Sequence, residues 1–295
     1  MERVKRAQAD AKLQLERARA RYGWVDIGVR TAKRYGDDDC GSYAAALTYY
    51  LFFSIFPLLL FAAAGLGYLT QGNRELRQDI LESGLKTVPV LSEAIDRSSL
   101  NQIEDNREAI ALTGLVLALY SGSGAVVALE HALNKVGHVR QEPNFLVKRA
   151  RSLKWLVVLG LASLASLALS TLVGFVVGPL GAALGIVAGV TVNVGIFATA
   201  FRFLPATERS WAQVLPGSVV AAVAFEILKF AGSFYLAKGA ASRQQTFGAL
   251  AGAAALLVAS YLISQIILFA AELNEALFER RAIRRASFEP VKEAT

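Results

Sequence analysis

Uncharged apolar stretches alternate with charged segments along the whole chain. The uncharged stretches cover residues 40–73, 109–129, 155–201, 210–225 and 244–271. A helix needs roughly 20 apolar residues to cross the hydrocarbon core of a bilayer, and a run of 18 or more is the main sign of a span. Four of the stretches meet this criterion directly. The fifth meets it when Glu226 and Lys229 are accepted within the helix, which then continues to residue 237.

This pattern predicts an all-α integral membrane protein with six transmembrane helices. The stretch 155–201 is too long for one helix at about 1.5 Å per residue, and Gly-Pro-Leu-Gly at 178–181 divides it into two. The predicted spans are about 43–70, 109–133, 153–177, 181–204, 211–237 and 247–277. A transmembrane domain at 43–278 then separates a basic segment at 1–42 from a basic tail at 279–295.

Two segments outside the spans have amphipathic patterns. Residues 1–35 carry ten Lys and Arg among spaced apolar positions, which indicates a basic helix at the membrane surface. For the first 20 residues a solvated charged tail is the alternative. Residues 71–108 form the longest connection, with apolar residues at helical spacing. We expect a helix there, at about 74–98, that lies on the outer surface or covers a cavity.

The distribution of Lys and Arg predicts the orientation. With six spans, both termini and every second connecting segment lie on the same side of the membrane. These parts hold 23 of the 31 Lys and Arg, the opposite side holds 7, and Lys229 lies within a span. Cytoplasmic loops carry the excess of positive charge, so both termini are expected in the cytoplasm. The formal net charge of +7 then reflects this bias and contact with anionic lipid head groups, with no specific nucleic-acid partner.

Small residues form a possible helix–helix interface. Gly181, Gly185 and Gly189 recur every four residues, and Gly248 and Gly252 repeat this spacing. Such faces let helices approach closely where no hydrophobic effect drives their association. The spacing is compatible with packing inside one chain and with a homodimer, and it does not separate the two.

Two positions are expected to weaken or bend a span. Pro57 lies in the middle of the first span, where proline removes a backbone donor and clashes with the preceding turn. Gly122 and Gly124 lie in Ser-Gly-Ser-Gly at 121–124, near the centre of the second span. These glycines allow a close backbone approach or a local break, and all three residues are candidate hinge points.

Ionisable residues within spans are the strongest candidates for a function. Burying a charge in the membrane costs several kcal/mol unless it is paired or hydrated. Glu226 and Lys229 are three residues apart and share a helix face. They form either a self-neutralising pair or the polar lining of a substrate or proton path, and we take them as candidate cavity residues.

Signals for an enzyme are weak, so we expect no catalytic activity, metal or cofactor. The two histidines, His131 and His138, have no third histidine or cysteine cluster to complete a zinc site. The chain lacks the GxxxxGK[ST] loop and therefore has no P-loop ATPase of its own. The single cysteine, Cys40, excludes an intramolecular disulfide.

An ordered set of short motifs resembles the YihY/virulence factor BrkB family over about residues 35–280. The motifs include AAALTYY at 44–50, ALN at 132–134, RFLP at 202–205, PG at 216–217, FGA at 247–249 and AELN at 271–274. The positions that carry the resemblance are Tyr49, Pro57, Asn134, Pro205, Pro216, Gly217, Gly248, Glu272 and Asn274. The usual Tyr-Gly before the last span reads Phe247-Gly248 here.

The resemblance implies a bacterial inner-membrane protein. Members of the family have been labelled ribonuclease BN, and they are linked to virulence and to the movement of lipids or lipopolysaccharide precursors. No catalytic residues are carried over, and the two histidines speak against the ribonuclease label. Our leading hypothesis is therefore a transporter or lipid-translocating protein, with a membrane scaffold or envelope-integrity factor as the alternative.

Overall fold

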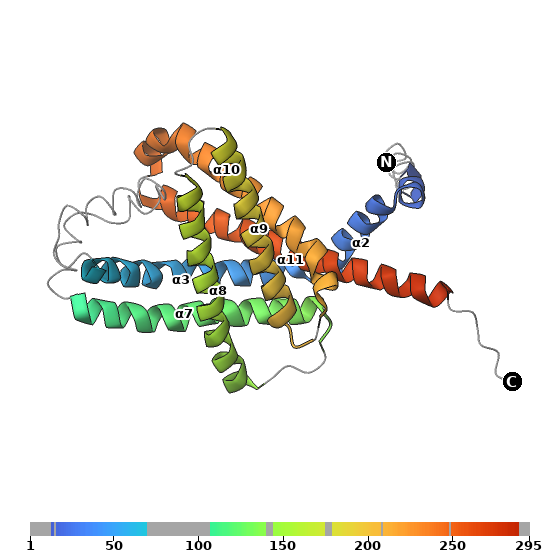
Figure 1. Ribbon diagram of the computed structural model, residues 1–295, viewed down its shortest axis with the longest axis horizontal. Helices are drawn as coiled ribbons and strands as arrows, with labels where there is room; N and C mark the ends of the chain where they lie inside the picture. Colours follow the sequence, from blue (N-terminus) through green and yellow to red (C-terminus); the bar gives the residue numbers. More distant parts are fainter. Residues whose placement is uncertain are drawn as a thin grey trace, which may run out of the picture.

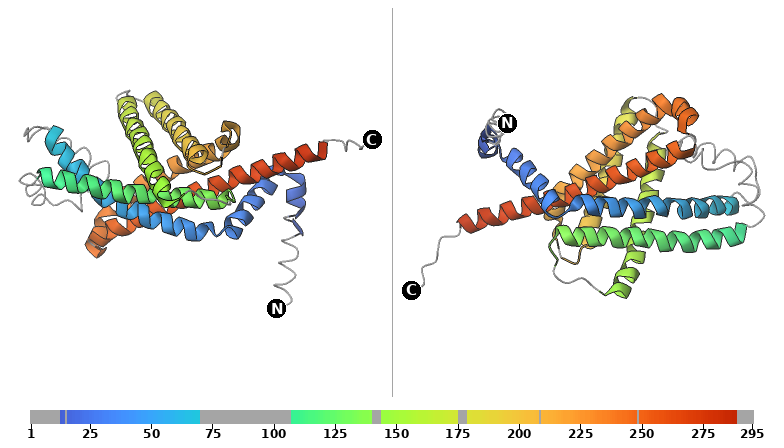
Figure 2. Two further views of the ribbon diagram at one scale, coloured as in Figure 1. Left: turned by 90° about the horizontal axis from the view of Figure 1, so that it is seen from below. Right: turned by 180° about the vertical axis from the view of Figure 1, so that it is seen from behind.

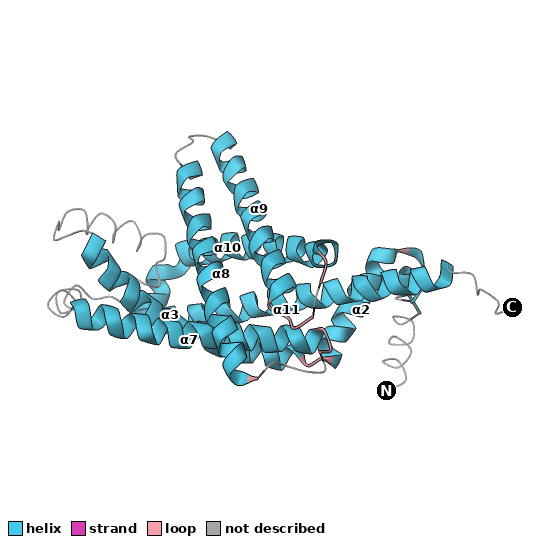
Figure 3. Ribbon diagram, turned by 60° about the horizontal axis from the view of Figure 1, so that its bottom comes forward, coloured by secondary structure: helices cyan, strands magenta, loops and turns pink. Residues whose placement is uncertain are grey.

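A computed structural model describes residues 13–14, 16–69, 107–139, 144–174, 179–207, 209–247 and 249–288. Within these ranges every regular element is a helix, which confirms the all-α fold class there (Figure 3). Gly248 and the surface helix expected at about 74–98 lie outside the described residues. The helices are α2 (Gly23–Asp37), α3 (Cys40–Leu69), α7 (Arg107–Val136), α8 (Phe145–Gly174), α9 (Pro179–Phe203), α10 (Trp211–Phe247) and α11 (Ala249–Phe288).

Four helices are long and apolar enough to cross a membrane. Their candidate spans are Leu112–Val136, Leu184–Phe203, Trp211–Gly232 and Gly252–Arg281. No more than 33% of the most apolar window in each span is buried inside the chain. Their remaining apolar side chains therefore face outward, as lipid contact requires. These four helices are the candidates among the described residues, and six spans with cytoplasmic termini stay predictions.

Several helices extend beyond the predicted apolar runs. α8 begins at Phe145, before the predicted span at about 153–177, so the basic stretch ahead of that span is helical as well. α10 continues to Phe247, and α11 continues to Phe288. The end of α11 is rich in Ala, Leu, Glu and Arg, which all have high helix propensity. Helix propensity therefore carries these elements past the ends of the apolar runs.

The helices form two connected groups (Figures 1 and 2). α3 and α7 lie side by side in opposite directions, and α11 packs against α3, α10 and α2. α8 and α9 form a hairpin that stands away from α3 and α7 and joins the rest where α8 crosses α7 and α9 packs against α10. The end of α7, the start of α10 and the second half of α11 meet near α2.

Alanine is the commonest residue among the described buried residues of the shared core. These alanines include Ala44 of α3, Ala132 of α7, Ala198 of α9, Ala221 of α10 and Ala270 of α11. Small residues allow close helix packing in a membrane, where apolar side chains gain little by leaving lipid for protein. These alanines therefore let the helices approach closely, while larger side chains such as Leu204 and Leu268 fill the remaining space.

The predicted hinge points lie inside continuous helices. α3 runs through Pro57, and α7 runs through Gly122 and Gly124. A Cβ atom added at Gly124 would lie 3.1 Å from the Tyr50 ring, and one at Gly122 would lie 3.0 Å from the Leu156 side chain. These glycines therefore allow α3 and α8 to approach α7 closely, while their role as hinges remains a prediction.

Candidate functional site

Polar and charged side chains gather where α2 meets the ends of α7, α10 and α11. We call this group the polar junction and define it as Arg34, Asn134, Arg209, Glu272, Asn274 and Glu275. Three of these residues, Asn134, Glu272 and Asn274, are positions that carry the family resemblance. The sequence places them in separate motifs, and the fold brings those motifs to one end of the helices.

Arg34 links α2 to two other helices. Its Nε donates to Glu272 Oε2 at 2.9 Å, and the Glu272 side chain is 0% exposed. The guanidinium also donates to the Val136 carbonyl oxygen at 3.4 Å and forms an ion pair with Glu279. Burial alone would lower the pKa of Arg34, but the hydrogen bond and charge of Glu272 raise it above its usual value. Arg34 therefore stays charged and holds α2 against α7 and α11.

The second carboxylate oxygen of Glu272 contacts another helix. Cys40, the first residue of α3, lies with its Sγ 3.3 Å from Glu272 Oε1, within hydrogen-bond distance for a thiol donor. A buried carboxylate is tolerated when an opposite charge and hydrogen-bond donors surround it. Glu272 thus joins α2, α3 and α11 through one side chain.

Asn274 makes the closest contact between α10 and α11. Its Oδ1 accepts a hydrogen bond from the Gly217 backbone N–H at 2.7 Å. A Cβ atom added at Gly217 would lie 2.2 Å from the Ala270 carbonyl oxygen and 2.6 Å from the Asn274 amide. Only glycine fits this position, which explains the Pro216-Gly217 motif in part.

Pro216 accounts for a second contact at the same place. Proline has no backbone N–H, so the Ala212 carbonyl one turn earlier lacks its usual helical donor. The Arg281 side chain of α11 donates to that carbonyl oxygen at 3.2 Å. The side chains of α11 therefore bond to α10 at Gly217 and at the carbonyl that Pro216 leaves without a helical donor.

The connection between α9 and α10 is held by α7 and α8. Asn134 of α7 accepts a hydrogen bond from the Ala206 backbone N–H at 2.7 Å, next to Pro205. Arg151 of α8 donates to the Leu204 carbonyl oxygen at 2.8 Å and to Glu130 of α7 at 2.9 Å. These bonds fix the connection although it has no regular structure of its own.

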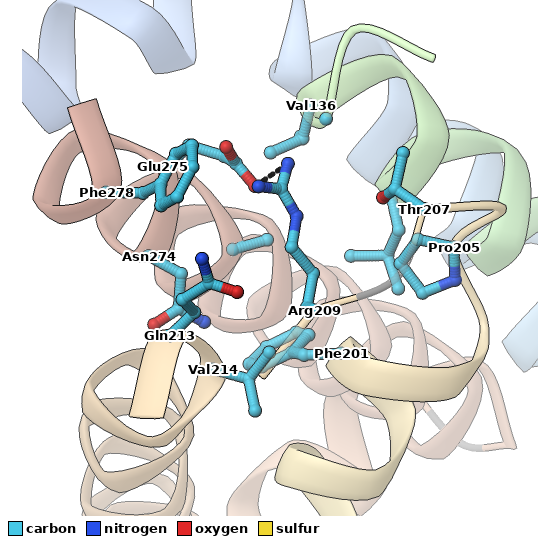
Figure 4. A pocket seen from close by; sticks show the side chains of 13 residues that line it. Val136, Phe201, Pro205, Thr207, Arg209, Gln213, Val214, Asn274, Glu275 and Phe278 are labelled. Carbon is cyan, nitrogen blue, oxygen red and sulfur yellow. Dashed lines mark ion pairs between the residues drawn. The ribbon is translucent and has the colours of Figure 1, made fainter. Parts of the chain in front are cut away.

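A small, open cavity lies beside this connection. Arg209 and Glu275 form an ion pair in it, with Nη2 and Oε1 at 2.7 Å (Figure 4). Pro205, Thr207 and Asn274 add to its lining, which joins the end of α7 to α10 and α11. Because its charges are paired, the cavity offers polar contacts with little net charge.

Glu226 and Lys229 lie elsewhere, between α9 and α10. Glu226 Oε1 accepts hydrogen bonds from Asn193 Nδ2 and from Lys229 Nζ, each at 2.7 Å. A Cβ atom added at Gly189 of α9 would lie only 2.9 Å from the same oxygen. Glu226 is thus buried against the glycine face of α9, and it does not line the cavity of the polar junction.

The other candidates have separate positions. Tyr49 lies on an exposed face of α3, with its ring 4.7 Å from that of Phe53. Pro57 lies two turns farther along the same helix. Among the described residues, no three His, Cys, Asp or Glu side chains gather in a way that could hold a metal ion.

Sequence reasoning missed Arg34, Arg151 and Asn193 as parts of these sites. Arg34 and Arg151 are two of many basic residues outside the predicted spans, and the sequence does not mark them. Asn193 does have a signal, because it is a polar amide inside the uncharged stretch 155–201. An amide at that depth needs a hydrogen-bond partner, and Glu226 is that partner.

Relatives from several bacteria align with most of the chain. Inner membrane protein YhjD of Escherichia coli (strain K12) is 24% identical over 267 residues, covering 82% of this chain and 78% of that protein. The putative ribonuclease-like protein YfkH of Bacillus subtilis (strain 168) is 25% identical over 264 residues, covering 85% of this chain and 94% of that protein. A UPF0761 membrane protein of Alkalilimnicola ehrlichii is 29% identical over 269 residues, covering 86% of this chain and 58% of that protein.

No solved structure matches the chain. The family described as Virulence factor BrkB matches residues 31–294, which is nearly the whole chain. This confirms the resemblance seen in the motifs around Asn134, Gly217 and Asn274. The chain is a membrane protein that belongs to the Virulence factor BrkB family.

Proposed function

We propose that this chain is a multi-pass protein of the bacterial cytoplasmic membrane that moves lipids across the bilayer without an ATPase of its own. In this proposal it acts like a flippase or scramblase, and it has no catalytic activity. The observation that carries the proposal is the polar group formed by Asn193, Glu226 and Lys229 within apolar helices.

This group reaches from the packed interior to the outer surface of α10. Asn193 and Glu226 are buried, whereas the Lys229 side chain is 48% exposed. Apolar neighbours on α10, such as Ile227 and Phe230, are exposed on the same helix. A lipid head group passing along this surface would meet a cation and, behind it, a carboxylate and an amide.

The energetics of the membrane favour a functional role for this group. An ionised side chain within a span costs several kcal/mol unless it is paired or reaches water, so such residues are retained mainly where they act on a substrate or an ion. Glu226 is paired, but Lys229 remains open to an anion on its exposed side. A phosphate group would be the natural ligand for this ammonium.

Lipid scrambling by the purified protein in liposomes tests the proposal. A fluorescent phospholipid is placed in both leaflets, and dithionite quenches the probe that reaches the outer leaflet. With the wild type we expect dithionite to quench well over half of the probe. With Glu226→Gln we expect the fluorescence beyond the first half to be lost about tenfold more slowly, in line with the loss of one charge-assisted hydrogen bond. Asp37→Asn is the matched control, because Asp37 is an exposed carboxylate of α2 outside the candidate spans.

Quenching that stops at half for the wild type would exclude passive lipid movement. An ion-coupled solute transporter would then remain, together with the second candidate, a membrane scaffold or envelope-integrity factor. One observation favours the scaffold: α2 is bonded to the polar junction and presents Trp24, which is 75% exposed, beside Tyr22. A scaffold would use this surface to bind anionic lipid or a second protein.

A further inference from the structure

Arg149 and Arg151 lie two residues apart on α8 and have different surroundings. Arg151 is paired with the buried carboxylate of Glu130 at 2.9 Å. Arg149 contacts only neutral groups among the described residues: it donates to the Tyr120 backbone carbonyl oxygen at 2.7 Å, and its guanidinium lies 4.7 Å from the centre of the Tyr120 ring. Arg151 thus has a carboxylate partner, and Arg149 has none within the part of the chain that the structure describes.

The position of Arg149 makes this charge unusual. Tyr120 belongs to the candidate span Leu112–Val136 of α7. At about 1.5 Å per residue, its carbonyl lies roughly 24 Å from Val136 and 12 Å from Leu112 along the helix. α8 crosses α7 (Figure 2), and the bond from Arg149 to the Tyr120 carbonyl oxygen lies at this point along α7. A guanidinium there lies beside the apolar part of a span and not at its end.

The surface around Arg149 is open and largely aromatic. Tyr120 is 72% exposed, and Tyr49 and Tyr50 of the neighbouring α3 are exposed as well. Gly124 lets the Tyr50 ring approach α7, and a Cβ atom added there would lie 3.9 Å from the Arg149 guanidinium. The absence of a side chain at Gly124 therefore lets the Tyr50 ring and the Arg149 guanidinium approach the same point of α7.

We propose that Arg149 binds the phosphate group of an anionic phospholipid, with the exposed rings of Tyr120 and Tyr50 in contact with its acyl chains. The guanidinium has five N–H donors in a fixed planar arrangement, and the Tyr120 carbonyl uses one side of it. The remaining donors suit a two-point contact with phosphate oxygens. The inference rests on the proposed function and gives the lipid path a head-group site on α7 and α8, separate from Lys229.

Two arguments favour a lipid over free phosphate. A guanidinium that meets no carboxylate among the described residues, beside an apolar span, favours an anion from outside the chain, and a lipid supplies that anion without leaving the membrane. The exposed aromatic rings next to it match acyl chains and would gain nothing from inorganic phosphate. Free phosphate has the same oxygen chemistry, and the experiment therefore separates the two sources.

Native mass spectrometry of the full-length protein, released from detergent micelles, tests the site. Phosphatidylglycerol, phosphatidylcholine or inorganic phosphate is added to the wild type and to Arg149→Gln. We expect Arg149→Gln to reduce the population that carries bound phosphatidylglycerol by about tenfold, the size of one charge-assisted contact. Arg149→Lys keeps the charge without the planar donors, so its lipid-bound population should lie between those of the wild type and Arg149→Gln. Lys154→Gln is the matched control, because Lys154 is an exposed cation of α8 that lies over Trp155.

Three results would overturn the inference: equal phosphatidylglycerol binding by Arg149→Gln and the wild type, an equal loss with Lys154→Gln, or displacement of the lipid by inorganic phosphate alone. A normal elution profile of Arg149→Lys on gel filtration shows that the site can be altered without unfolding. The proposed function fails separately, in liposomes, if the wild type does not scramble lipid. If the protein binds lipid at Arg149 but does not scramble lipid, the binding site is supported and only its role in a lipid path is excluded.

Discussion

The polar junction and the group around Glu226 both place ionised side chains among apolar helices, but they satisfy these charges in different ways. In the junction, Arg34 and Glu272 meet between three helices and have further hydrogen-bond partners. Around Glu226, one carboxylate oxygen accepts both donors, and one of these, Lys229, extends to the exposed surface of α10.

The difference suggests a division of roles. A charge that is buried and fully bonded on all sides contributes to the position of the helices, and its loss should be seen first in stability. A charge that is only partly enclosed can still bind another molecule, and its loss should be seen first in activity. The substitutions below test this division from the largest expected effect to the smallest.

The largest effect is expected for Arg34→Met. The substitution leaves the Glu272 carboxylate buried without its cation, which costs about 3–5 kcal/mol for a buried pair. Chemical unfolding in a mild detergent, followed by circular dichroism, measures the change. Arg30→Gln is the control: Arg30 pairs with Asp26 at 2.8 Å in the same helix, in a more exposed position. For Arg30→Gln we expect the free energy of unfolding to fall by about 0–1 kcal/mol. Equal losses in both variants would mean that Glu272 is not truly enclosed.

A smaller loss is expected for Gly217→Ala. The new Cβ atom would lie 2.2 Å from the Ala270 carbonyl oxygen, so α10 and α11 must separate. Overpacking of this kind costs typically about 1–3 kcal/mol. Gly232→Ala in the same helix is the control, because a Cβ atom there meets nothing within 4 Å. Thermal unfolding should show a lower midpoint for the first variant and an unchanged or higher midpoint for the second, and the reverse order would contradict the packing of α10 on α11.

The sequence predicted these regions unequally. Runs of uncharged residues were enough to predict the helical spans at Trp211–Gly232 and Gly252–Arg281, because the bilayer imposes their length and composition. The motifs around Asn134, Gly217 and Asn274 predicted the family, which the comparison over residues 31–294 confirmed. These signals are local, and each can be read within one segment of chain.

The contacts between segments could not be predicted in the same way. Arg34 and Glu272 are 238 residues apart, and many other basic residues in the N-terminal segment could have been chosen by charge alone. The crossing of α8 over α7, which brings Arg149 to Tyr120, depends on helix packing and not on any periodic pattern. The pairing of Asn193 with Glu226 could have been found, because both are isolated polar residues in apolar stretches.

The smallest effect on stability is expected for Gly189→Ala. A Cβ atom there would lie 2.9 Å from Glu226 Oε1, at the end of a flexible side chain that can move aside. We expect a stability change below about 1 kcal/mol, together with slower scrambling, because the carboxylate shifts away from Asn193 and Lys229. Gly195→Ala, also in α9, is the control, since a Cβ atom there meets nothing within 4 Å.

The same variant bears on the homodimer that the glycine spacing allows. Gly185 and Gly189 are four residues apart and share a face of α9, and Gly189 already contacts Glu226 of α10 within one chain. A second copy could use this face only by displacing α10, together with the Asn193–Glu226 hydrogen bond. We therefore expect Gly189→Ala to leave the fraction of cross-linked dimers in membranes unchanged while it slows scrambling. A lower dimer fraction with normal scrambling would instead assign this face to the contact between copies and leave Glu226 a structural role.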